Sequence, residues 1–193
     1  MYHTVKAVKT SKNIPITVVP IMGAANVRTP ERDSLDFSKE LAYAYGGTYH
    51  YIYAPLFVNS EEVRDSLEQE PNIKGCLELA RNADIILTSV GSIVYKSWKS
   101  YLSTRDLYNL EKKGAIGHIG GHFYDMEGNE VVTPFVNKMI GLGIEDIKNT
   151  ENVICVAGLE MKAEAILGAV RGGYINTPVS YTHLRAHETD QYL

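Results

Sequence analysis

Apolar positions along the chain follow two alternating periods. Short runs of largely β-branched residues predict strands, and stretches with an apolar residue every three or four positions predict helices. The predicted strands cover 14–21, 48–54, 84–87 and 153–157. The predicted helices cover 1–12 and 33–45, a short segment after Ser60, 71–80, 103–113 and 160–171.

This alternation of strands and helices predicts an α/β domain with a mainly parallel sheet. The continuous apolar runs DIIL at 84–87 and VICVA at 153–157 are typical of strands that are covered by helices on both faces. A chain of 193 residues suits one domain with a sizeable core.

Three of the predicted strands end in small residues, at Met22–Gly23, at Gly91–Ser92 and at Gly158. Ligands of parallel α/β sheets bind outside the carboxyl ends of the strands. Lys162 falls in the first turn of the last predicted helix, where a lysine beside free backbone N–H groups suits a phosphate. The alternative for Lys162 is a solvated surface lysine.

The stretch from Gly114 to Gly128, GAIGHIGGHFYDMEG, carries His118 and His122, four residues apart. Each histidine could act in chemistry, hold a ligand or pack. If 119–124 is extended, both lie on one face and Asp125 on the other, which argues against a catalytic group oriented by Asp125. The sequence DMEG predicts a turn that closes a small hairpin.

Tyr49, Tyr51 and Tyr53 alternate with His50 and Ile52, which places the three phenol rings on one face of the strand. Such a face could form an interface between subunits or pack under a helix. The sequence therefore leaves open an oligomerisation module without a ligand.

Charge and composition exclude several classes of protein. The net charge of -4 gives no basic patch for nucleic acid, and no apolar run is long enough to cross a membrane. No signal peptide, phosphate-binding P-loop or GxGxxG motif is present in the sequence. Cys76 and Cys155 lie far apart in apolar contexts, which favours buried free thiols in a reducing cytoplasm over a disulfide.

Four segments together carry a resemblance to a known family: PITVVPIMGA, NADIILTSVGSI, KKGAIGHIGGHFYDMEGNEVV and NVICVAGLEMKAEAILGAVRGGYI. From about Tyr2 to Pro178 the chain resembles the sugar-binding domain of SorC/DeoR-type bacterial transcriptional regulators. The resemblance implies a Rossmann-like fold related to sugar-phosphate isomerases and deaminases. It also implies a phosphorylated sugar as effector, a homo-oligomer (dimer or tetramer), and no cofactor.

The resemblance also suggests ligand contacts. Lys162 and Gly91 match positions near the ligand, and His118 stands where relatives place an acidic residue that bonds sugar hydroxyls. Met22 replaces a basic residue of some members and removes its charge. Asp33 lies near a polar contact of some relatives. With Gly23 and Ser92 at the strand ends, these residues form the predicted ligand site.

The chain also departs from the pattern of this family at both ends. Relatives have a helix-turn-helix domain and a phosphate-binding loop before the residue that matches Tyr2, so we expect DNA binding only through a domain missing here. The tail 179–193 resembles translated sequencing adapter, and we reject a metal site at His183, His187 and Glu188. We expect an effector-binding domain at 1–178 without catalytic residues; a sugar-phosphate isomerase or deaminase is the enzymatic alternative.

Overall fold

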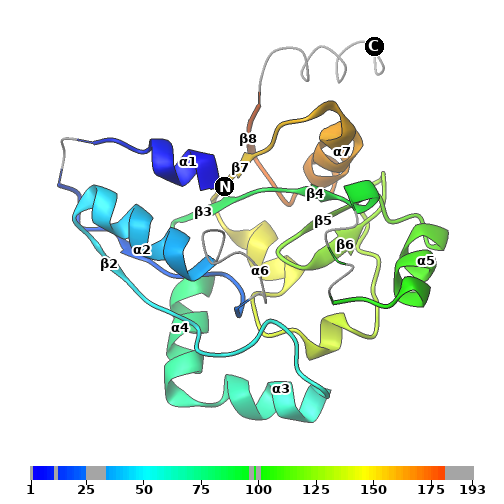
Figure 1. The fold of residues 1–193 in the computed structure, drawn as a ribbon, viewed down its shortest axis with the longest axis horizontal. Coiled ribbons are helices and arrows are strands. Elements are labelled where there is room, and N and C mark those ends of the chain that lie inside the picture. Colours follow the sequence, from blue (N-terminus) through cyan, green and yellow to red (C-terminus); the bar gives the residue numbers. More distant parts are fainter. Residues whose placement is uncertain (1, 11–12, 25–33, 96–97, 99–100, 181–193) are drawn as a thin grey trace. The chain divides into compact units, whose positions relative to one another are not determined.

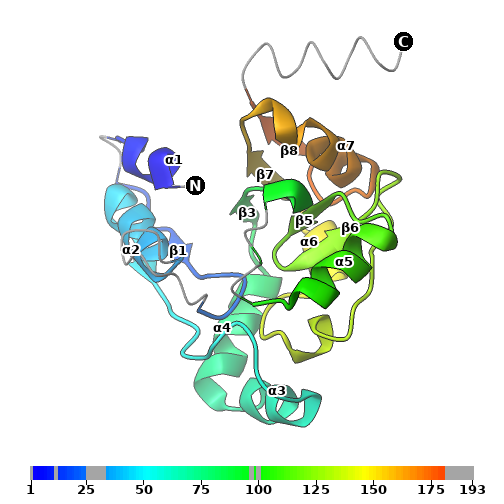
Figure 2. The same cartoon turned by 45° about the vertical axis from the view of Figure 1, so that its right-hand side comes forward.

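The structure, a computed structural model, describes residues 2–10, 13–24, 34–95, 98 and 101–180. The chain forms two compact units, 1–83 with 137–142 and 84–136 with 143–193. Both mix helices with short strands, as Figures 1 and 2 show. The domain is therefore of the mixed α/β, Rossmann-like class predicted from the sequence.

The first unit contains one two-stranded parallel sheet and four helices among its described residues. Their bounds are α1 Tyr2–Ala7, β1 Thr17–Val18, α2 Ser34–Tyr45, β2 Thr48–Tyr49, α3 Glu61–Glu68 and α4 Pro71–Arg81. In Figure 1, α2 runs alongside β1 and β2. The core packs Ile52 and Ile140 against the inner face of α4.

The strands predicted at 14–21 and 48–54 form ladders of only two residues each, pairing Thr17 with Thr48 and Val18 with Tyr49. Pro15 and Pro20 flank the ladder and have no N–H to donate, which stops it from growing. Beyond the ladder the two segments are still joined by a backbone hydrogen bond: the N–H of Ala24 donates to the carbonyl of Ala54 at 2.8 Å. The predicted strands were therefore in the right places but too long.

The second unit holds two three-stranded sheets among its described residues, one parallel with the order β3–β7–β8 and one antiparallel with the order β4–β5–β6. The strands are β3 Ile85–Thr88, β4 Gly91–Ser92, β5 Gly117–Ile119, β6 His122–Tyr124, β7 Asn152–Val156 and β8 Thr177–Val179. The helices are α5 Thr104–Lys112, α6 Ile144–Asn149 and α7 Ala163–Arg171, with short 3₁₀ turns at Ile93–Tyr95, Val136–Lys138 and Glu160–Lys162. Asn137 and Lys138, the last two residues of the turn Val136–Lys138, belong to the first unit.

The predicted buried strand at 84–87 is covered on one face only by the described residues. Ile86 is 2% exposed, whereas its neighbour Ile85 is 56% exposed. Successive side chains of a strand point to opposite faces, so the two values mark a covered and an uncovered face of β3.

Gly120 and Gly121 separate β5 from β6 and give the largest departure from the predicted pattern. Their φ angles are +55° and +94°, the left-handed values that a two-residue hairpin turn needs. The segment 119–124 is therefore a hairpin and not one extended strand. His118 pairs with Phe123 and His122 pairs with Ile119, so the two histidines lie on opposite faces. The expectation of a shared face was wrong.

Helix α7 packs on the β5–β6 hairpin at very short range. A Cβ at Gly117 would lie 2.7 Å from the Cβ of Ala165, and one at Gly168 would lie 2.7 Å from the carbonyl of Asp125. The hydroxyl of Tyr124 donates to the carbonyl of Ala165 at 2.8 Å. These contacts select the side of α7 that is buried.

The buried residues of α7 are Ala165, Ile166, Gly168 and Ala169, whereas Val170 is 45% exposed. The apolar pattern of the sequence predicts a buried stripe of Ala163, Ile166, Leu167 and Val170; of these only Ile166 is buried, so the buried side is rotated from the predicted one. Close approach to the hairpin needs small side chains, and this requirement outweighs the burial of the larger ones.

Candidate functional site

The predicted ligand residues Gly91 and His118 face each other across the β4–β5 ladder. The fit is tight, since a Cβ at Gly91 would lie 2.1 Å from Nε2 of His118. Glycine at position 91 therefore makes room for the imidazole ring. Ser92 is buried at 4% exposure, and its hydroxyl accepts a weak hydrogen bond from the N–H of Val94 at 3.4 Å.

The imidazole of His118 lies in an aromatic environment. Its ring centroid is 5.1 Å from that of Trp98, edge to face, and 5.5 Å from that of Phe123. The side chain is only partly buried, but its Nε2 is fully enclosed and has no hydrogen-bond partner among the described residues. Burial, with a smaller contribution from the charge of Lys162, lowers the pKa of His118 to about 3. His118 is therefore neutral at ordinary pH and can donate or accept one hydrogen bond from Nε2.

Lys162 ends the 3₁₀ turn Glu160–Lys162 and is the residue before the first turn of α7. Its Nζ donates to the carbonyl of Val90 at 2.8 Å, which ties the amine to the segment that leads into β4. Burial lowers the pKa of Lys162, and the nearby thiol of Cys155 opposes this shift. The ammonium group is thus fixed in position and only partly solvated, unlike a solvated surface lysine.

The structure brings together four of the seven predicted site residues, all in the second unit: Gly91, Ser92, His118 and Lys162. The β4–β5 ladder brings together the backbones of Gly91, Ser92 and His118. The side-chain amine of Lys162 joins them through its hydrogen bond to the carbonyl of Val90. This cluster, with Val90 and Trp98, is called the β4–β5 site below.

The remaining three predicted residues do not belong to this cluster. Met22 and Gly23 lie in the first unit, where Met22 forms an antiparallel bridge with Gly141. A Cβ at Gly23 would lie 2.6 Å from the carbonyl oxygen of Pro55, so close packing accounts for this glycine. Asp33 lies outside the described residues.

His122 and Asp125 both have structural partners. Nδ1 of His122 lies 2.7 Å from Oε1 of Glu130, and the imidazole is buried. The carboxylate of Asp125 accepts hydrogen bonds from the N–H groups of Glu127 and Asn129, which close the predicted DMEG turn. Asp125 therefore shapes a turn and orients neither histidine.

Sequence reasoning missed Val90 and Cys155 as neighbours of the site. Trp98 falls in the segment 93–102, for which the sequence leaves open a loop over the pocket; its side chain is 8% exposed and packs against His118. Val90 stands directly before the predicted Gly91–Ser92 pair, but nothing in its side chain marks a carbonyl that accepts from a lysine. Cys76 and Cys155 are free and buried, as predicted.

The lowered pKa of His118 gives the fold an expected pH dependence. As the pH falls below about 6.5, the unfolded chain binds a proton at this residue and the folded chain does not until about pH 3. The free energy of unfolding should therefore decrease over this window, by up to about 1.4 kcal/mol per pH unit from this group. Urea unfolding from pH 7 to pH 4 would measure the slope.

His118→Phe is expected to have a shallower slope than the wild type, because it removes the titrating group. His50→Phe is the matched control, since His50 is exposed. Equal slopes for the wild type and His118→Phe would contradict the assignment.

Two features of other classes of protein are absent from the described residues. No helix among them is long and apolar enough to span a bilayer. No cluster of three or more His, Cys, Asp or Glu side chains suited to a metal ion occurs among them. His183, His187 and Glu188, rejected above as a metal site, lie outside the described residues.

Comparisons with known proteins place the chain in a family. Residues 1–180 match the family model described as "Putative sugar-binding domain". Transcriptional regulator LsrR of Escherichia coli K12 is 34% identical over 135 residues, which cover 67% of this chain and 43% of LsrR. The transcriptional regulator YjhU of the same strain is 27% identical over 170 residues, covering 86% of this chain and 51% of YjhU.

The chain thus spans about half the length of these curated relatives. Among solved structures, the full-length sorbitol operon regulator SorC from Klebsiella pneumoniae matches with a TM-score of 0.90 at 21% identity, covering 97% of this chain and 62% of that one. These relatives are named as regulators and not as enzymes. The chain belongs to the sugar-binding domain family of SorC- and DeoR-type transcriptional regulators.

Proposed function

We propose that this chain is the effector-binding part of a cytoplasmic, sugar-responsive transcriptional regulator and that its effector is a phosphorylated sugar. The observation that carries the proposal is the position of Lys162, whose amine is held 2.8 Å from the carbonyl of Val90 at the β4–β5 site. A fixed, partly desolvated ammonium group is the kind of group that binds a phosphate oxygen with a charge-assisted hydrogen bond.

The other residues of the β4–β5 site suit the sugar. Neutral His118 offers one hydrogen-bonding atom, Nε2, that no described residue uses. A hydroxyl that pairs with this nitrogen would remove the cost of leaving a buried polar atom unpaired. An effector would thereby bind across β4, with its phosphate towards Lys162 and a hydroxyl towards His118.

Regulation would follow from a population shift. An effector that binds one arrangement of the subunits of a homo-oligomer more tightly raises the share of that arrangement. DNA affinity would then change in a DNA-binding domain outside these residues. This coupling needs no chemistry on the sugar, in keeping with the regulatory names of the relatives.

A thermal unfolding screen with sugar phosphates tests the proposal. A sugar phosphate at about 100 times its dissociation constant stabilises the folded state by about 2.7 kcal/mol, which raises Tm by about 5 to 10 °C for a chain of this size. The same sugars without phosphate are the matched controls, and a product assay on each hit checks for turnover. Equal shifts with and without phosphate, or turnover of the hit, would overturn the proposal.

A further inference from the structure

Leu159 has a strained backbone, and among the residues that the structure describes it alone has a positive φ without being glycine. Its φ and ψ angles are +84° and +128°, a combination that glycine adopts freely and other residues rarely adopt. Such conformations persist where the surrounding structure enforces them, and they cluster at ligand-binding sites. The strain at Leu159 therefore indicates a role that local sequence preference does not explain.

Leu159 lies just beyond the carboxyl end of β7 and directly before the 3₁₀ turn Glu160–Lys162. Its carbonyl accepts a hydrogen bond from the N–H of Lys162 at 2.9 Å, so the strained residue closes the turn that carries this lysine. The turn lies beside β4, the strand Gly91–Ser92. The strain is therefore located at the β4–β5 site.

The side chain of Leu159 is 49% exposed, so burial among the described residues does not compensate for the strain. Two further apolar side chains near Lys162 are exposed: Met161, in the same turn, is 52% exposed, and Val94, two residues after β4, is 66% exposed. Single exposed apolar residues are common on protein surfaces. These three occur together beside one partly buried ammonium group, and Val94, Leu159 and Met161 are called the apolar rim below.

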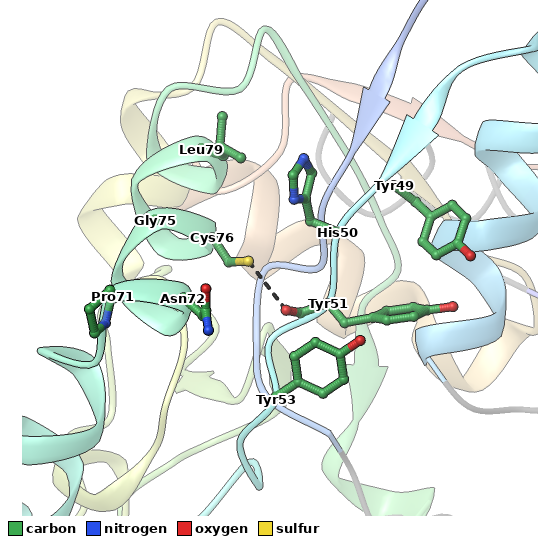
Figure 3. A pocket seen from close by; sticks show the side chains of 9 residues that line it. All are labelled: Tyr49, His50, Tyr51, Tyr53, Pro71, Asn72, Gly75, Cys76 and Leu79. Atoms are coloured by element: carbon green, nitrogen blue, oxygen red, sulfur yellow. Dashed lines mark hydrogen bonds between the residues drawn. The ribbon is translucent and has the colours of Figure 1, made fainter.

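The exposed tyrosines of the first unit differ from the apolar rim. Tyr53 is 77% exposed, but its ring packs edge to face on that of Tyr51, with centroids 5.8 Å apart. Figure 3 shows both rings on the side of the 49–53 segment that faces away from helix α4. Neither tyrosine has a positive φ, whereas Leu159 combines an exposed side chain with a strained backbone.

We propose that Leu159 determines the specificity of the β4–β5 site by contacting an apolar C–H edge of the sugar phosphate, an inference that rests on the proposed function. The phosphate lies at Lys162, and the sugar covers the side chain of Leu159. Burial of this side chain against the sugar compensates for the backbone strain. A hydroxyl at this edge would lose its hydrogen bonds to water and gain none from leucine. The apolar rim therefore selects sugar phosphates by the position of their hydroxyls.

Titration calorimetry of the full chain with glucose 6-phosphate, fructose 6-phosphate and ribose 5-phosphate tests this inference. For the one that the wild type binds most tightly, Leu159→Ala is expected to weaken binding about 5- to 30-fold, because the apolar contact is lost. Leu159→Met keeps an apolar side chain of similar size and is expected to bind within about threefold of the wild type. Val132→Ala is the matched control, since Val132 is 60% exposed and lies outside the apolar rim.

Leu159→Gly separates the side-chain contact from the shape of the turn. Glycine relieves the strain, which outweighs the greater freedom that glycine gives the unfolded chain, so Tm is expected to rise by about 2 to 4 °C. The same variant is expected to bind the sugar phosphate at least as weakly as Leu159→Ala. A residue that only shaped the turn could be replaced by glycine without loss of affinity.

The outcomes distinguish this inference from the proposed function. Wild-type affinity in Leu159→Ala and Leu159→Gly would overturn the inference and leave the proposed function intact. An equal loss in Leu159→Ala and Leu159→Met, or a lower Tm in Leu159→Gly, would also overturn the inference alone. If the wild type binds none of the three sugar phosphates, the proposed function fails and the inference fails with it.

Discussion

Gly128→Ala is expected to lower the free energy of unfolding by about 2 to 5 kcal/mol, from backbone strain and overpacking together. Gly128 has φ +84°, a left-handed value that side chains disfavour. A Cβ there would lie 2.1 Å from the backbone nitrogen of Gly172. Neither group can rotate away, because both belong to the main chain. Urea unfolding of the variant would measure the loss.

Gly114→Ala is the matched control for this prediction. Gly114 has a similar φ of +82°, but no described atom beyond its chain neighbours lies within 4 Å of a Cβ there. Its substitution should therefore cost only the strain, about 1 kcal/mol. Similar losses at both positions would mean that the contact between Gly128 and Gly172 contributes nothing.

Lys162→Met is expected to weaken binding of a sugar phosphate by at least about 30-fold, because a partly buried charge that pairs with a ligand is lost. Methionine keeps the length of the side chain and removes its charge. Titration calorimetry with the sugar phosphate that raises Tm most would measure the change.

Lys113→Met is the matched control. Nζ of Lys113 also donates to a backbone carbonyl, that of Val132 at 3.1 Å, but this lysine is exposed. Its substitution should leave the affinity unchanged. If both variants bind with wild-type affinity, Lys162 does not contact the effector, and the placement of the phosphate is wrong.

Helix ends were predictable from the sequence because their signals are local. The spacing of Ser103 and Asp106 is a capping-box signal in the sequence, and the two residues form that box in the structure. Ser60 is a favourable N-cap residue and caps α3. Pro71 suits the first turn of a helix and begins α4, whose buried residues include Ile73 and Leu77. Each of these features depends on residues within four positions of one another, so no knowledge of the tertiary fold is needed.

Features set by distant residues were harder to predict. The buried side of α7 depends on Gly117 in β5, about fifty residues away, and bulk alone selected the wrong stripe. Gly120 and Gly121 formed a turn in a stretch whose residues also suited a strand. Propensity does not decide between these alternatives; pairing with a neighbouring strand does.

The residues of the candidate site were predictable only in part. Strand-end position and the family resemblance identified Gly91, His118 and Lys162 together, and the structure places them in one cluster. The carbonyl of Val90 could not be identified from the sequence as the acceptor for Lys162. Every residue has a carbonyl, and only the fold determines which one lies next to the lysine.

The small-residue contact between α7 and the β5–β6 hairpin has a mechanical consequence. Lys162 precedes α7 and His118 lies on β5, so both are attached to elements that are locked together at Gly117 and Gly168. Main-chain atoms and methyl groups in contact leave little room for sliding. The distance between the ammonium group of Lys162 and the imidazole of His118 is thereby fixed before any ligand binds. A sugar phosphate would be selected by its length between phosphate and hydroxyl.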